Sequence, residues 1–121
     1  MARIIHTEHG KFILSDPGKG KLRNERDILD LMGLFGEAGE YLLLIAEGAL
    51  YKDFFDLSTG LAGEICHKLS TYRVKTAIVA DIETVPSQPF REWAGECNRG
   101  GEIRFCADMD EAERWLLDLE R

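Results

Sequence analysis

The chain alternates short apolar segments with longer amphipathic ones. Residues 41–46 and 74–80 are the clearest of the short segments, and only one charged side chain, Lys75, interrupts them. Short, nearly continuous apolar segments are typical of strands in a sheet that is covered on both faces. Because helical patterns separate these segments along the chain, the sequence predicts an α/β fold with a largely parallel sheet.

The remaining elements complete a single domain over residues 1–121. Two β-prone segments, 3–7 and 11–15, flank a turn and predict an N-terminal β-hairpin. About four helices are expected, each from a capping side chain and an apolar stripe: from Asn24 to Phe35 with Gly36 and Gly39 at its end, from Ser58 to Ser70, from Ser87 to Arg99, and from Asp110 to Leu119. A last strand is expected over residues 102–106. The expected fold is a mixed, mostly parallel sheet with the hairpin at its antiparallel edge.

The charge balance argues against some classes of function. The chain has 22 acidic and 15 basic side chains, for a net charge of −7. A general nucleic-acid-binding protein must neutralise several phosphates, so we expect no nucleic-acid partner. Residues 1–26 nevertheless carry a net charge of +3 and the rest −10. This basic edge is either a solvated loop or a surface that steers an acidic partner.

Nothing in the sequence predicts attachment to a membrane or export. The apolar run Leu42–Ala46 is far shorter than the ~20 residues that a membrane helix needs. The first residues lack the apolar stretch of a secretory signal. The expected location is therefore the cytoplasm.

Histidine and cysteine form no recognisable metal-binding pattern. Cys66, Cys97 and Cys106 are far apart in the sequence and never form a C-x-x-C pair. His6 and His9 would point to opposite faces of a strand. We therefore expect no metal site and no cofactor.

The most informative segment covers residues 53–64 and joins a predicted central strand to the second helix. Its sequence is D-F-F-D-L-S-T-G-L-A-G-E. Ser58 and Thr59 stand at the expected helix start, and Gly60 and Gly63 leave the first turn without bulk. Such a helix end favours an anion, or a phosphate on its own hydroxyl group. The alternative is an ordinary serine cap with glycines that allow close packing.

The residues Leu57-Ser58-Thr59-Gly60-Leu61, followed by a second buried strand, resemble the STAS domain of sulfate transporters and anti-sigma-factor antagonists. In the antagonist branch, a partner kinase phosphorylates the hydroxyl residue before the glycine. The resemblance therefore implies a STAS-like fold, with Thr59 as the phospho-acceptor and Ser58 beside it as a second candidate. Two positions depart from the STAS pattern: the acidic residue before the hydroxyl pair is displaced to Asp56, and Glu64 adds a charge.

The span from Tyr51 to Leu116 also looks like an uncharacterised bacterial domain family. The match lies in residues 53–57, 59–64 and 97–101. This resemblance implies a fold and not an activity.

Carboxylates follow three of the predicted strands. Glu47 follows the first, Asp81 and Glu83 the second, and Asp108 and Asp110 the third. Ligands of parallel α/β sheets bind at the carboxyl ends of strands, where such groups could hold Mg²⁺ for phosphate chemistry. Alternatively, these side chains cap the helices that follow or stay hydrated.

Asn98-Arg99-Gly100-Gly101 is a third candidate site. Arg99 could bind a carboxylate or a phosphate through two parallel hydrogen bonds. The alternative is a helix C-terminus in which Gly100 or Gly101 takes a positive φ.

These observations together predict a non-enzymatic regulatory or binding module whose partner is a protein or a small anionic ligand. The candidate ligand-binding residues are Asp56, Gly60, Gly63, Glu64, Asp81, Asn98 and Arg99. One alternative is a metal-dependent phosphate enzyme that uses Glu47, Asp81 and Asp108. The other is a small structural partner subunit, and a homodimer is one expected assembly.

Overall fold

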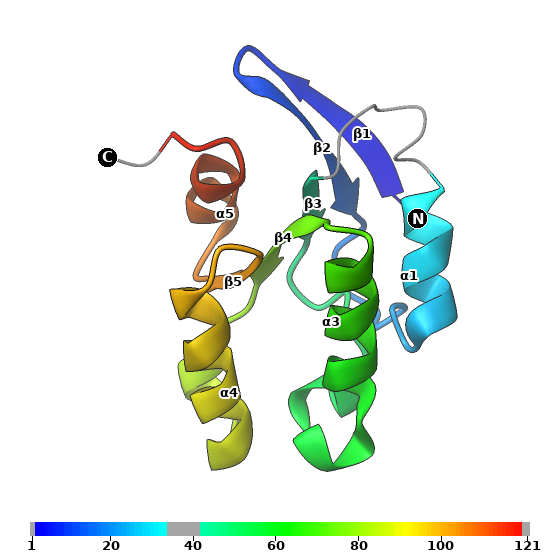
Figure 1. Cartoon of the computed structure of the whole chain (residues 1–121), viewed down its shortest axis with the longest axis vertical. Coiled ribbons are helices and arrows are strands. Elements are labelled where there is room, and N and C mark those ends of the chain that lie inside the picture. Colours follow the sequence, from blue (N-terminus) through cyan, green and yellow to red (C-terminus); the bar gives the residue numbers. More distant parts are fainter. Residues whose placement is uncertain (1, 34–41, 120–121) are drawn as a thin grey trace.

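A computed structural model describes residues 2–33 and 42–119 and confirms the α/β fold. The sheet has five strands in the order β1-β2-β3-β4-β5, and Figure 1 shows them running from the blue hairpin to the orange β5. β1 pairs antiparallel with β2 and all other pairs are parallel. The strands are β1 (Ala2–Thr7), β2 (Gly10–Ser15), β3 (Leu42–Ile45), β4 (Lys75–Val79) and β5 (Ile103–Cys106).

The helices in the described residues cover both faces of this sheet. They are α1 (Glu25–Met32), α3 (Leu61–Thr71), α4 (Gln88–Arg99) and α5 (Met109–Leu116). Each parallel strand lies beside the one before it, so right-handed connections place α1, α3 and α4 on the same face. α5 follows the last strand and covers the opposite face. In the described ranges, every helix is too short to span a bilayer.

Alternate side chains of each strand point into two separate apolar cores. In β3, Leu43 and Ile45 pack toward α1, α3 and α4, whereas Leu44 packs toward α5. In β4, Ile78 and Val79 divide in the same way. All five side chains are at least 95% buried. This two-sided burial is the physical reason for the continuous apolar sequence of the central strands.

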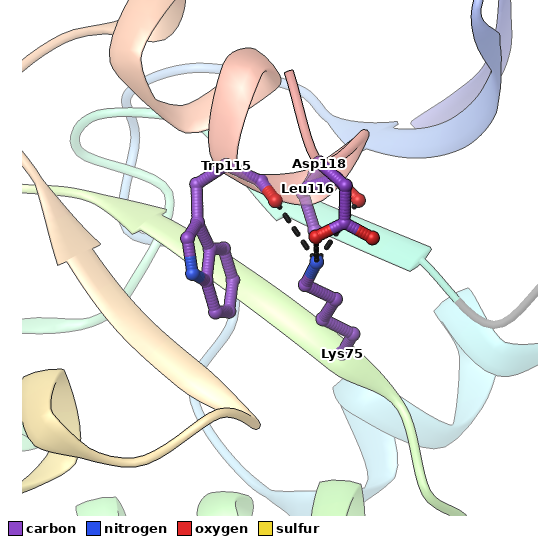
Figure 2. Close-up of polar contacts among 4 residues, drawn as sticks. All are labelled: Lys75, Trp115, Leu116 and Asp118. Carbon is purple, nitrogen blue, oxygen red and sulfur yellow. Dashed lines mark hydrogen bonds and ion pairs between the residues drawn. The ribbon is translucent and has the colours of Figure 1, made fainter. Parts of the chain in front are cut away.

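Lys75 of β4 anchors the C-terminal end of α5 (Figure 2). Its Nζ donates hydrogen bonds to the carbonyl oxygens of Trp115 (2.9 Å) and Leu116 (3.2 Å). The same ammonium group lies 3.2 Å from Asp118 Oδ1 and 4.6 Å from the centre of the Trp115 ring. The last carbonyls of a helix lack partners within it and carry partial negative charge. Backbone amides of Leu117, Asp118 and Leu119 bind carbonyls of this last turn, and Lys75 adds the contacts that fix α5 to the sheet.

Replacing Lys75 with methionine is expected to lower the free energy of unfolding by about 1–3 kcal/mol. The substitution keeps most of the apolar stem and removes the hydrogen bonds of a charged donor. Urea unfolding measures the loss, and hydrogen exchange should be faster in α5 than in α3. Asp118→Asn is the matched control: the Asp118 side chain is 90% exposed, so the loss should stay below about 0.5 kcal/mol. Equal losses in the two variants would contradict the anchoring role.

Capping side chains set the starts of α1, α4 and α5, and several of the expected boundaries need correction. Asn24 and Ser87 cap α1 and α4 as predicted. The last helix is capped by Asp108, which accepts a hydrogen bond from the Glu111 amide, and not by Asp110. α1 ends at Met32 and α5 at Leu116, both earlier than expected. The predicted helix residue Phe35 and the predicted stop residues Gly36 and Gly39 lie outside the described residues.

Candidate functional site

The segment Asp56–Glu64 begins differently from the prediction. Ser58 and Thr59 do not belong to α3 but to a separate 3₁₀ turn, Leu57–Thr59. Gly60 then takes a left-handed conformation, with φ of +78°, and α3 starts at Leu61. The prediction that Ser58 caps this helix is therefore wrong, because the chain turns sharply at Gly60 before the helix can begin.

Asp56 holds the 3₁₀ turn from its N-terminal side. Its Oδ1 accepts hydrogen bonds from the backbone N–H of Ser58 (3.0 Å) and from the Ser58 hydroxyl (2.7 Å). These bonds favour the charged carboxylate and lower the pKa of Asp56 below its usual value. Ser58 thus orients Asp56 and is itself occupied by it.

The Asp56 turn is expected to weaken in acid. Because the pKa of Asp56 is lower in the folded chain than in the unfolded chain, its charged carboxylate stabilises the fold at any pH above the unfolded pKa. This stabilisation is lost as the pH falls through the pKa of Asp56 in the folded chain. An NMR titration of the Asp56 carboxyl carbon should give a pKa below the usual value of about 3.9. In Ser58→Ala, which lacks the hydroxyl donor, the pKa should rise. An unchanged pKa in that variant would refute this assignment.

Thr59 holds the turn from its other side. Its hydroxyl lies within donating distance of two carbonyl oxygens, that of Asp53 (2.7 Å) and that of Asp56 (2.9 Å). The same oxygen accepts a hydrogen bond from the Leu61 amide (3.2 Å). Thr59 is nevertheless exposed. Its side chain therefore fixes the backbone on which it stands and connects the turn to the first residue of α3.

The fold explains Gly60 but not Gly63. Gly60 is required by its positive φ, which most other residues adopt only with strain. Gly63 lies in the first turn of α3, and a Cβ atom there would meet no atom within 4 Å. The alternative prediction that these glycines allow close packing is therefore wrong, since neither has a neighbour that a Cβ would touch. The described fold supplies no internal reason for Gly63.

The charges around this segment oppose an anion. The amide N–H groups of Ala62 and Gly63 have no acceptor among the described residues, as expected at a helix start. However, Asp53, Asp56 and Glu64 lie in the same short stretch of chain, and Asp56 and Glu64 are exposed. Their negative charges counteract the positive helix end, so the site suits a cationic surface better than a phosphate.

Of the three carboxylates in the metal-enzyme alternative, Asp81 and Asp108 act as caps. Asp81 accepts a hydrogen bond from the Glu83 amide (3.1 Å), and Asp108 accepts one from the Glu111 amide (2.9 Å). Among residues 2–33 and 42–119, His, Cys, Asp and Glu side chains form no group of three or more that could hold a metal ion. The capping alternative is therefore confirmed for Asp81 and Asp108.

Two hollows nevertheless lie at the C-terminal ends of the parallel strands. Glu47 and Asp81 border a hollow of about 230 Å³, which Phe55 also lines. Glu47 and Asp108 border a second hollow of about 420 Å³ on the α5 face. The structure thus brings Glu47 near each of the other two carboxylates but does not gather all three around one hollow.

Asn98 has a structural role at the edge of the sheet. Its Oδ1 accepts a hydrogen bond from the Phe105 amide of β5 (2.7 Å), and its carbonyl oxygen accepts one from Arg104 Nη2 (3.4 Å). The side chain of Arg99 is exposed and makes no hydrogen bond or ion pair with the described residues. Gly100, with φ of −88°, and Gly101 both lack the positive φ that the C-cap alternative predicted. The helix ends with a hydrogen bond from the Gly100 amide to the Cys97 carbonyl (3.0 Å) and not with a left-handed glycine.

Asn98→Ala is expected to lower the free energy of unfolding by about 1–2 kcal/mol. The substitution leaves the Phe105 amide without its acceptor at a partly buried position. The neighbouring Arg99→Ala is the control, with an expected loss below about 0.5 kcal/mol. Chemical denaturation of both variants tests this, and a larger loss for Arg99→Ala would show that the assignment is reversed.

Sequence reasoning missed a cavity of about 250 Å³ at the end of β2. It lies between the loop after β2 and α1, and Ala49 of the loop after β3 also lines it. The buried Ser15, the apolar Leu22 and Leu31, and the charged Lys21 and Asp30 line part of it. The clustered glycines of the two loops were the available signal. These glycines indicate that the two backbones approach each other closely only once the fold has placed the two loops side by side.

Residues 8–116 match a family described as a domain of unknown function, DUF4180. No significant match was found among curated proteins or among solved structures. The matched span includes β2 to β5 and all the candidate site residues named above. The family description names no activity. Because the match covers most of its length, the chain belongs to the DUF4180 family.

Proposed function

We propose that this chain is a non-enzymatic module that binds a protein partner through the surface of Asp56–Glu64. The observation that carries the proposal is Gly63. A glycine inside a helix destabilises it by about 0.5–1 kcal/mol relative to alanine. No described neighbour of Gly63 lies close enough to exclude a side chain at this position. A partner whose backbone or side chain approaches the first turn of α3 would supply the reason that the isolated fold lacks.

The conformation of the segment supports the same function. Asp56 and Thr59 hold an exposed loop in one shape through hydrogen bonds made inside the segment. A preformed loop loses less conformational entropy when a partner binds it. Exposed, well-positioned loops are also where binding residues are concentrated in folded domains.

The charge of the segment selects the class of partner. The carboxylates of Asp56 and Glu64 favour a partner that presents lysine or arginine. A small anionic ligand, the other class expected from the sequence, would have to bind against those carboxylates. The proposal therefore takes a basic protein surface as the partner and makes phosphate binding an outcome of the test.

Phosphorylation is the regulatory part of the proposal, and it rests on the resemblance of this segment to STAS domains. A phosphate on Thr59 would remove the proton that its hydroxyl donates and would bring negative charge toward the carbonyl oxygens of Asp53 and Asp56. A phosphate on Ser58 would repel the Asp56 carboxylate. Either modification would open the turn and so release the partner.

The test uses a substitution that separates binding from folding. Gly63→Ala should raise the free energy of unfolding by about 0.4–1 kcal/mol, because Gly63 already has a helical conformation. Gly95→Ala in α4 is the matched control, since a Cβ there also meets no atom within 4 Å. A partner recovered with the wild-type chain is purified, and its dissociation constant is measured by calorimetry for all three proteins at two salt concentrations.

We expect Gly63→Ala to weaken binding about tenfold or more, whereas Gly95→Ala binds like the wild type. Thr59→Glu should also weaken binding, and Thr59→Ser should not. Equal affinity for wild type, Gly63→Ala and Thr59→Glu would refute the proposal. Saturable shifts of the Gly60–Glu64 amide signals on titration with inorganic phosphate would instead support an anion site.

A further inference from the structure

The two edge strands of the sheet, β5 and β1, differ in whether side chains bind their outward backbone groups. At the β5 edge, the outward amide of Phe105 is bound by Asn98, and Arg104 reaches back to the Asn98 carbonyl. Such blocking prevents an edge strand from pairing with another chain. β1 forms the opposite edge and pairs only with β2 among the strands of the described residues.

The hairpin register shows which backbone groups of β1 remain open. A two-residue turn joins Thr7 to Gly10, and this closing pair of a short hairpin is hydrogen-bonded. The backbone N–H and C=O groups of alternate residues in β1 therefore point away from β2, and these residues are Ala2, Ile4 and His6. Their N–H and C=O groups have no partner in the described part of the chain.

We propose that a second copy of this chain pairs with β1 in antiparallel orientation, so that two sheets join into one across a two-fold axis. In the register centred on Ile4, Ala2 faces the partner's His6, and Ile4 faces the partner's Ile4. Each facing pair exchanges two backbone hydrogen bonds. The strand is thus complementary to itself, as a two-fold interface requires.

The side chains of β1 fit this pairing. Ile4 and Ile5 are only partly buried in the single chain and lie on opposite faces of the sheet. In the proposed register Arg3 lies opposite the partner's Ile5, so the two arginines do not face each other. The described part of β1 also lacks proline and lysine, two residues that commonly protect an edge. The inference does not depend on the partner surface proposed at Asp56–Glu64.

The experiment combines mass measurement with hydrogen exchange. Sedimentation should give twice the monomer mass of 13.7 kDa at micromolar concentrations, and the Ile4→Pro variant should sediment as a monomer. Proline removes an outward N–H but leaves the bonds to β2 intact. In the wild type, the Ile4 and His6 amides should exchange at least tenfold more slowly in concentrated than in dilute samples. This measurement requires no variant.

Several outcomes would overturn the inference. A wild-type monomer at all concentrations would do so, and so would a dimer in which the Ile4 and His6 amides exchange freely. Protection of these amides in a monomer would mean that another part of the same chain covers the edge. If only an added extended peptide protected them, the edge would bind a different partner.

Discussion

Replacing Phe54 with alanine is expected to destabilise the protein by about 4 kcal/mol. Phe54 comes from the first half of the Asp53–Glu64 motif and is completely buried. Its ring lies 5.4–6.3 Å, centre to centre, from Phe55, Phe90, Trp93 and Phe105. Truncation would remove these contacts and leave a cavity, and such losses amount to about 3–5 kcal/mol for a buried phenylalanine.

Urea unfolding of Phe54→Ala measures this loss directly. The control is Phe55→Ala, because Phe55 is the adjacent ring but is only partly buried. The expected loss there is about half as large, since part of the ring already contacts water. A loss below about 1.5 kcal/mol for Phe54→Ala would mean that the aromatic cluster does not fix the position of the candidate segment.

Gly48→Ala is expected to cost about 3 kcal/mol for a different reason. Gly48 has φ of +79°, and a Cβ atom there would lie 2.9 Å from the Cα of Gly18. The two loops are also joined by hydrogen bonds from the Gly18 amide to the Glu47 carbonyl (2.8 Å) and from the Gly20 amide to the Gly48 carbonyl (2.9 Å). Alanine would add backbone strain of about 1–3 kcal/mol and push the two loops apart.

Gly60→Ala is the matched control for Gly48→Ala. Gly60 has almost the same φ, +78°, but a Cβ there meets no atom within 4 Å. Its substitution therefore reports backbone strain alone, and the difference in the free energy of unfolding reports the close approach to Gly18. Equal losses at the two positions would show that the loops can separate without cost.

Local patterns predicted the fold well because they act over a few residues. Leu43, Leu44 and Ile45 are apolar on both faces of a strand, which is why the sequence indicated a covered central strand. Asn24 and Ser87 cap helices through bonds to amides three residues ahead. Asp108 and Asp110 both fit a cap by sequence, and only the position where β5 ends selects Asp108.

The candidate site was predicted less completely. The sequence indicated that residues 53–64 join a strand to a helix and placed Ser58 and Thr59 at the helix start. It did not indicate that the Thr59 hydroxyl lies against the carbonyl of Asp53, because that contact requires the 3₁₀ turn between them. Asn98 was a ligand candidate by its residue type, yet its partner Phe105 belongs to the next strand.

The sequence by itself determined the order of strands and helices, the mainly parallel sheet and the burial of both its faces. These properties follow from apolar periodicity and capping, which involve neighbours along the chain. Only the tertiary structure decided the roles of Lys75, Gly48 and Asn98. Each role depends on a contact with another element or loop, and the packing of α5, of the two loops and of β5 creates those contacts.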